Sequence, residues 1–198
     1  RRVRVIFGTN EERGSKCMKR YVELGEELPA AGFTPDADYP IIYAEKGIIT
    51  YTLSMPFAPS GDMKVVSLEG GVAANVVMAE VKAVIEDPRP ECRGRILTAA
   101  KAWKGPQGSS LEASEEGDKV TLLMKGRPAH GSTPEKGVNA LACLAGFMRE
   151  ARLKGEQGEF FNAFNSTVAF ETDGKSLAVA MKDSVSGSLT ACVGVVKA

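Results

Sequence analysis

The chain has 198 residues, of which 43% are hydrophobic and 25% are charged, as in a globular protein with one large domain or two small ones. The 25 basic residues equal the 25 acidic residues in number, so no overall field attracts nucleic acid or an acidic membrane surface. No stretch approaches the roughly 18 consecutive apolar residues of a membrane helix. We therefore expect neither nucleic acid nor a membrane as a partner.

The first 46 residues predict part of an α/β domain. Alternating β-branched residues predict a strand over 3–7, and apolar residues at helical spacing predict a helix over 11–24. Thr9 or Asn10 is the expected N-cap of this helix. A loop over 32–40 follows.

Two adjacent carboxylates, Glu11 and Glu12, mark the corner between this strand and this helix. Catalytic and ligand sites of open α/β sheets gather just beyond the carboxyl ends of strands, where these two residues are expected. Glutamate is also common in the first helical turn, because the helix dipole favours anions there. The position alone leaves both explanations open.

From residue 47 onward the pattern changes to strands alternating with helices. The predicted order is β/α/β/α/β, which favours an α+β sandwich with a mainly antiparallel sheet. We therefore expect an α+β protein with two domains, over 1–46 and 47–198. The predicted strands lie at 47–55, 76–85, 119–126 and 188–196; the predicted helices lie at 91–103, 134–153 and 158–165; a Gly/Ser/Glu-rich loop lies at 105–118, and "STPE" is the expected capping box of the second helix.

The four cysteines lie far apart and form no C-x-x-C pair. Their apolar or helical surroundings favour free, mostly buried thiols over disulfides or a zinc knuckle. Free thiols are typical of a reducing compartment, so we expect a cytoplasmic protein. The cysteines are Cys17, Cys92, Cys143 and Cys192.

Four blocks of sequence, in this order and spacing, carry a resemblance to a known family. They are "IFGTNEERGSKCM", "GFTPDADYPIIYAEKGI", "GVAANVV" and "GRPAHGSTPEKGVNA". Together they resemble the dinuclear-zinc metallopeptidases of the aminoacylase/carboxypeptidase-like family, and "DADYPIIYAEKG" is most specific to the PepV-type dipeptidases within it. The resemblance implies a partial metal-binding catalytic domain over 1–46 and a lid domain over 47–198.

The resemblance implies hydrolysis of a dipeptide amide bond by a zinc-bridged water. In that family the first Glu of the pair is the general base and the second binds zinc, which implies these roles for Glu11 and Glu12. Asp36 matches the next carboxylate ligand, and Asp38 is its neighbour and second candidate. Without the resemblance, Asp36 is explained as a turn residue after proline. Two zinc ions are implied for a complete site, with manganese or cobalt as alternatives.

The single histidine, His130, lies in a loop, where a histidine is most often a solvated surface residue. The resemblance instead implies that His130 reaches from the lid to stabilise the oxyanion of the tetrahedral intermediate. Asn75 matches a lid residue that contacts substrate, although an Asn in a turn needs no function. The lid of some relatives mediates dimerisation, so both a monomer and a homodimer stay open.

Two zinc ions need about four or five protein ligands, and this chain offers too few. It has no match to the family's H-x-D block, bridging Asp, late ligand His or substrate-binding Arg. The chain also lacks an initial methionine and its ends run through expected strands, so we expect a fragment that is inactive without the missing parts of its parent chain. The alternatives are a deacylase of the same family, such as an aminoacylase or a desuccinylase, and a non-catalytic lid-like module for dimerisation or binding.

Overall fold

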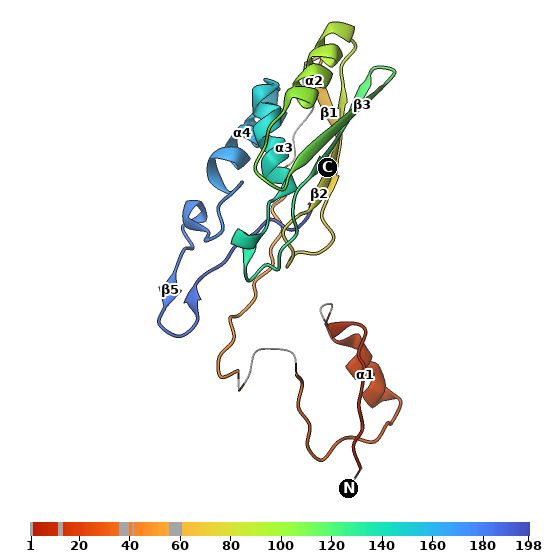
Figure 1. Cartoon of the computed structure of the whole chain (residues 1–198), viewed down its shortest axis with the longest axis vertical. Helices are drawn as coiled ribbons and strands as arrows, with labels where there is room; N and C mark the ends of the chain where they lie inside the picture. Colours follow the sequence, from red (N-terminus) through yellow and green to blue (C-terminus); the bar gives the residue numbers. More distant parts are fainter. Residues whose placement is uncertain (1, 12–13, 36–39, 41, 56–60) are drawn as a thin grey trace. The chain divides into compact units, whose positions relative to one another are not determined.

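The computed structural model describes residues 2–11, 14–35, 40, 42–55 and 61–198 (Figure 1). The chain divides into two compact units, Arg1–Tyr43 and Ala44–Ala198. The catalytic and lid roles expected for 1–46 and 47–198 stay predictions.

The described part of the first unit contains one α-helix, α1 (Lys16–Glu23), and no buried residue. The strand predicted over 3–7 is wrong for this structure, since Val3 and Phe7 are 88% and 89% exposed and no strand is formed. A strand needs a neighbour for its N–H and C=O groups, and the described residues of this unit provide none. The segment is held instead by polar contacts: an Nη1 of Arg4 donates to the hydroxyl of Tyr21 over 2.6 Å.

The second unit is built on an antiparallel sheet, which confirms a mixed α and β protein with a mainly antiparallel sheet. The order of its five strands is β3-β4-β2-β1-β7, and β5 pairs with β6 in a separate short ribbon. The strands are β1 (Lys64–Gly70), β2 (Glu80–Glu86), β3 (Ser110–Glu116), β4 (Lys119–Lys125), β5 (Lys182–Asp183), β6 (Gly187–Ser188) and β7 (Val196–Lys197).

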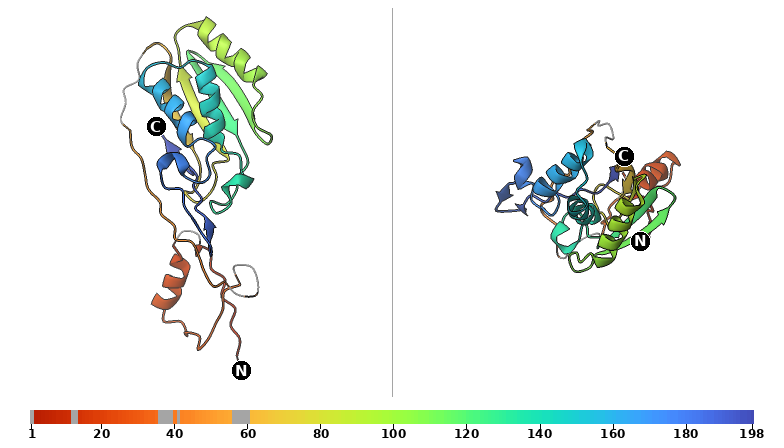
Figure 2. Two further views of the ribbon diagram at one scale, coloured as in Figure 1. Left: turned by 90° about the vertical axis from the view of Figure 1, so that its left-hand side faces the viewer. Right: turned by 90° about the horizontal axis from the view of Figure 1, so that it is seen from above.

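Three α-helices cover one face of this sheet (Figure 2). They are α2 (Pro90–Ala102), α3 (Ala140–Glu150) and α4 (Gly155–Thr167), with short 3-10 helices η2 (Pro134–Lys136) and η3 (Lys175–Leu177). Across the described ranges, none of the helices has the length and apolar character needed to cross a bilayer.

The core lies between the helices and alternate residues of the two central strands. In β2 and β4 the side chains that face the helices are completely buried, and they lie opposite one another in the register. On α3 the residues Leu144 and Phe147 are 0% and 1% exposed and complete this layer. Burial of each Val, Ile, Leu, Met or Phe side chain in this layer stabilises the fold by about 1.5 to 3 kcal/mol. The opposed pairs are Val81 with Met124, Ala83 with Leu122, and Ile85 with Val120.

Two predictions in this unit are corrected by the sheet. The loop predicted over 105–118 contains β3, which forms a hairpin with β4 through Gly117, whose φ of 62° suits a glycine turn. The strand predicted over 47–55 does not form in the described residues, where Ile49 and Leu53 are 87% and 80% exposed. Strand β3 was hard to predict because a polar strand at a sheet edge has few apolar residues in its sequence. The segment 47–55 is apolar but has no neighbouring strand among the described residues with which to form hydrogen bonds.

The helix predicted from residue 134 begins later than the capping box suggests. Residues 134–136 form η2, and α3 starts at Ala140 with Asn139 as its N-cap. The Oδ1 of Asn139 accepts from the backbone N–H groups of Leu141 and Ala142 at 2.9 and 3.4 Å. The "STPE" capping box is therefore wrong, because Asn139 supplies the cap that helix α3 needs.

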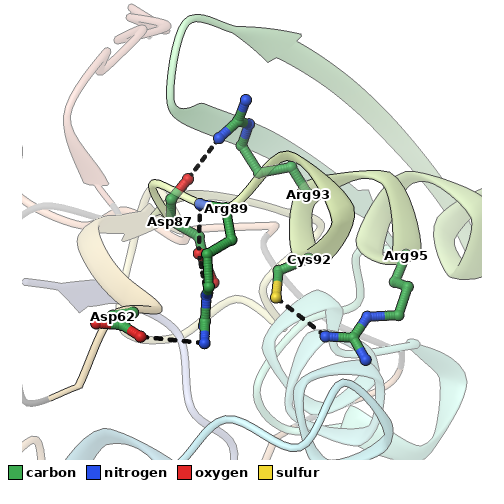
Figure 3. A network of polar contacts seen from close by, with 6 residues as sticks. All are labelled: Asp62, Asp87, Arg89, Cys92, Arg93 and Arg95. Atoms are coloured by element: carbon green, nitrogen blue, oxygen red, sulfur yellow. Dashed lines mark hydrogen bonds and ion pairs between the residues drawn. The ribbon is translucent and has the colours of Figure 1, made fainter.

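A buried carboxylate holds the connection between β2 and α2 (Figure 3). Asp87 is fully buried, and its two oxygens accept from Nε and Nη2 of Arg89 at 2.9 and 2.8 Å. Arg89 also contacts Asp62 at 3.1 Å, and Arg93 donates to the backbone carbonyl of Asp87 at 2.7 Å. The hydrogen bonds from Arg89 hold the pKa of the Asp87 carboxyl below its usual range. This network fixes the start of α2. The helix was predicted from the sequence, but the network was not.

Gln157 joins α4 to the sheet through a second buried polar contact. Its Oε1 accepts from the backbone N–H of Val65 at 2.9 Å, and its Nε2 donates to the carbonyl of Val65 at 2.7 Å. The register of β1 shifts between Val65 and Ser67, and the segment 196–198 bonds to β1 at Gly70, Glu69 and Leu68 but not at Val65. Val65 pairs with Ile85 of β2, so the glutamine amide takes the place of a strand neighbour on the side of β1 that β7 covers further along.

Candidate functional site

Glu11 lies in the turn that precedes α1, and its side chain is exposed. The backbone N–H of Gly14 donates to its carbonyl at 3.2 Å. The helix predicted from residue 11 begins at Lys16, because Gly14 and Ser15 have φ values of 89° and 48°, which are not helical. Glu11 is therefore not in the first helical turn, and the argument from successive helical side chains does not apply to it.

The side chain of Asn10 accepts a hydrogen bond from the first residue of this helix. Its Oδ1 accepts from the backbone N–H of Lys16 at 3.1 Å, while its backbone carbonyl accepts from the N–H of Ser15 at 2.9 Å. The N-cap position of α1 is nevertheless Ser15, so the predicted N-cap at Thr9 or Asn10 is wrong. A backbone hydrogen bond from Asn10 also lowers the pKa of the Cys17 thiol, which lies in the first turn of α1.

The predicted metal ligands Glu12 and Asp36, and the second candidate Asp38, lie outside the described residues. Among the residues that the structure does describe, no three His, Cys, Asp or Glu side chains gather closely enough to hold a metal ion. The described residues therefore do not form a metal site by themselves. The zinc site implied by the resemblance stays a prediction.

The structure brings Asn75 and His130 together, although they come from different segments of the chain. Val76 and His130 form an antiparallel bridge, and the backbone N–H of Gly131 donates to the carbonyl of Asn75 at 2.6 Å. Next along, the N–H of Val77 donates to the carbonyl of Ala129 at 2.9 Å. The two residues that the resemblance assigns to substrate contact thus share one backbone ladder.

Gly131 allows the two segments to approach this closely. A Cβ atom at this position would lie 2.9 Å from the backbone oxygen of Asn75, closer than real Cβ contacts. Any other residue would push the segment of His130 away from that of Asn75. The glycine is therefore a structural requirement of this corner.

Ser132 holds the imidazole of His130. The backbone N–H of Ser132 donates to Nδ1 over 3.2 Å, and its Oγ lies 2.8 Å from the same nitrogen. His130 itself is exposed. The sequence predicts Ser132 in a capping box and not in this contact, for which the signal is a hydroxyl two residues after the single histidine.

A surface hollow of about 270 Å³ lies beside the same loop. It is bounded by Val77, which follows the residue bridged to His130, and by Pro134, Asn139, Phe170 and Cys192. Burial raises the pKa of the Cys192 thiol. The volume of this hollow is slightly below the range of ligand pockets, which starts at about 300 Å³.

All four cysteines are free in the structure, which agrees with the prediction of unpaired thiols. Cys92 and Cys143 are buried, while Cys17 and Cys192 are partly exposed. Burial raises the pKa of the Cys143 thiol, which disfavours the reactive thiolate, so Cys143 contributes to packing in the core.

No protein-family model matches the chain. Among curated proteins, it is 36% identical over 200 residues to "Putative dipeptidase YtjP" of Bacillus subtilis (strain 168), covering 100% of this chain and 42% of that protein. It is 30% identical to "Putative dipeptidase SH1171" of Staphylococcus haemolyticus and 27% identical to "Putative dipeptidase SAUSA300_1697" of Staphylococcus aureus (strain USA300), each over 99% of this chain and 42% of the relative. The chain is thus similar along its whole length to proteins with this name, and spans under half of their length.

Proposed function

We propose that this chain belongs to a metal-dependent dipeptidase of the dinuclear-zinc family, as part of its catalytic domain and its lid. The observation that carries the proposal is the 36% identity, over the whole chain, to the protein named "Putative dipeptidase YtjP". The backbone ladder that joins Asn75 to His130 supports it, since both residues were assigned to substrate contact from the sequence. The first unit has no buried residue among those described, as expected if it packs on further parts of the protein.

In this proposal Glu11 is the general base. It takes a proton from the attacking water and delivers it to the departing amine. The carboxylate of Glu11 is exposed in a turn, so substrate and water can reach it. Glu12 and Asp36 would contribute oxygen ligands for the metals, together with ligands from outside these residues. Zinc, when bound, supplies a more acidic water and neutralises developing negative charge.

The lid supplies contacts to the substrate. His130 donates a hydrogen bond to the oxyanion of the tetrahedral intermediate, and Asn75 contacts the substrate beside it. Both residues come from an independent unit with its own core, which suits a body that closes over a site and excludes water. The free cysteines fit a cytoplasmic protein.

The test is hydrolysis of a panel of dipeptides by the full-length protein that carries these residues, with and without a metal chelator. We expect hydrolysis that is lost with the chelator and restored by zinc, manganese or cobalt. N-acyl amino acids are the matched alternative substrates, and preference for them would identify a deacylase instead. Absence of both activities in a folded, metal-loaded protein would refute catalysis and favour a lid-like module for dimerisation or binding.

A further inference from the structure

Two potential hydrogen-bond donors of Ser132 lie close to one ring nitrogen of His130, Nδ1. The backbone N–H of Ser132 points at Nδ1 over 3.2 Å, and the Ser132 hydroxyl oxygen lies 2.8 Å from that nitrogen. A backbone N–H can only donate, so Nδ1 must be the acceptor in this contact. The serine hydroxyl can rotate to donate to the same lone pair.

A neutral imidazole carries its single proton on one nitrogen and accepts at the other. Because Nδ1 accepts from Ser132, the proton of neutral His130 lies on Nε2. The acceptor Nδ1 lies on the side of Ser132, so the donor Nε2–H lies at the opposite edge of the ring. A hydrogen-bond donor at Nε2 is what an oxyanion requires, whereas the other tautomer would present a lone pair to it.

The backbone around His130 is fixed on both sides, which leaves the ring orientation to Ser132. The backbone of His130 forms a bridge with Val76, and the N–H of Thr133 donates to the carbonyl of His130 at 2.9 Å. These bonds set where the Cβ of His130 lies, but they do not choose its side-chain rotamer or its tautomer. The contacts of Ser132 with Nδ1 restrain both.

We propose that Ser132 is a positioning residue for His130, which holds the imidazole in the Nε2–H tautomer so that Nε2–H is the donor to the substrate oxyanion. The part that concerns the substrate rests on the proposed function. The hold of Ser132 on the ring is a property of the chain alone. The two parts can therefore be tested separately.

The first experiment is nitrogen-15 NMR of the 198-residue chain labelled at histidine. His130 is the single histidine, so its two ring nitrogens give one unambiguous set of signals. For the neutral ring we expect Nε2 to be protonated and Nδ1 to have the shift of a hydrogen-bonded acceptor. In Ser132→Ala we expect Nδ1 to lose part of this shift and the tautomer ratio to move toward that of free imidazole. Ser132→Thr keeps the hydroxyl and should restore the original signals.

The matched control is Ser176→Ala. It removes another exposed serine hydroxyl, which lies 2.6 Å from a carboxylate oxygen of Glu171 in a different loop, and should leave the His130 signals unchanged. Because Ser132→Ala keeps the backbone N–H and removes only the hydroxyl, identical ring signals in the folded wild type and folded Ser132→Ala would overturn the positioning role of the Ser132 side chain. That result would leave the dipeptidase proposal intact.

The second experiment measures dipeptide hydrolysis by the full-length protein. We expect Ser132→Ala to lower kcat about 10- to 100-fold with little change in KM, and Ser132→Thr to recover most of the loss. An unchanged kcat, together with altered ring signals, would overturn the catalytic part of the inference. If the wild type hydrolyses no dipeptide while the ring signals still depend on Ser132, the proposed function fails and the hold of Ser132 on His130 stands.

Discussion

Replacing Gln157 with methionine tests how the second unit completes its sheet. Gln157 is 3% exposed and makes two hydrogen bonds to the backbone of Val65, which is itself 8% exposed. Methionine has a similar length but offers neither bond, so it leaves one buried N–H and one buried C=O without a partner. Each such group costs about 1 to 3 kcal/mol, so the free energy of unfolding should fall by about 2 to 6 kcal/mol. A domain of this size has about 5 to 15 kcal/mol in total.

The assay is urea unfolding of the chain followed by circular dichroism. With an m-value of about 2 kcal/mol/M, a loss at the middle of that range lowers the midpoint by about 2 M. Gln107→Met is the matched control, because Gln107 is exposed and its replacement should change stability by less than about 0.5 kcal/mol. If Gln157→Met kept the wild-type midpoint, the amide would not be completing β1.

Gln157→Glu refines the test through pH. A buried carboxylic acid, when protonated, can accept from the N–H of Val65 and donate to its carbonyl, as the amide does. Ionised, it can only accept, and its charge is buried. Gln157→Glu should therefore regain stability relative to Gln157→Met as the pH falls, and parallel pH profiles of the two variants would contradict this account.

Three further predictions concern single positions elsewhere in the second unit. Asp87→Asn should destabilise the chain by about 2 to 4 kcal/mol at neutral pH. Because the pKa of the Asp87 carboxyl is lowered in the folded chain, its stabilising contribution is present above pH ~4 and is lost as the pH falls through the folded pKa. The difference in urea midpoint between wild type and Asp87→Asn should therefore shrink in acid, and a difference that grew would contradict us. Gly131→Ala should cost about 1 to 3 kcal/mol and shift the amide signals around Asn75 in NMR spectra, since its Cβ would lie 2.9 Å from the Asn75 oxygen; unchanged signals would show that the corner tolerates a side chain. Arg152→Gly should raise the melting temperature, with a gain of about 0.5 to 1 kcal/mol, because Arg152 has a φ of 59° just after α3, whereas Ala151→Gly, at a φ of −67°, should lower it.

The elements that the sequence predicted well are those whose signal is local. The strand at 119–126 alternates buried and partly buried residues, and the helix at 91–103 has proline at its start, so β4 and α2 form within a residue or two of their expected limits. The segments at 3–7 and 47–55 have equally strong strand patterns but form none. A strand depends on a neighbour that no local pattern reveals.

The errors in the second unit have a similar origin. Strand β3 is rich in serine and glutamate because it lies at the edge of the sheet, so its composition is that of a loop. Strand β1 was missed altogether, although its residues Val65 and Leu68 are buried. The late start of α3 depends on the cap by Asn139, which competed with an equally good capping box in the sequence.

The functional roles of the candidate site residues stay predictions. The resemblance named Asn75 and His130, and the structure places their segments side by side, which neither spacing nor composition could reveal. The contact between Ser132 and Nδ1 depends on the tight turn after His130, where residues 132 and 133 both bond back to it. Glu11 is exposed in a turn, and the roles of Glu12 and Asp36 stay predictions because they lie outside the described residues.

The most direct test of the proposed chemistry is the turnover of the full-length protein with Glu11→Gln. Glutamine keeps the size of the side chain but cannot take the proton of the attacking water, so kcat for a dipeptide should fall about 100- to 10,000-fold while bound metal, measured by elemental analysis, stays at the wild-type level. Glu23→Gln, an exposed carboxylate change on α1, should retain wild-type turnover. Wild-type turnover in Glu11→Gln would show that the general base lies elsewhere.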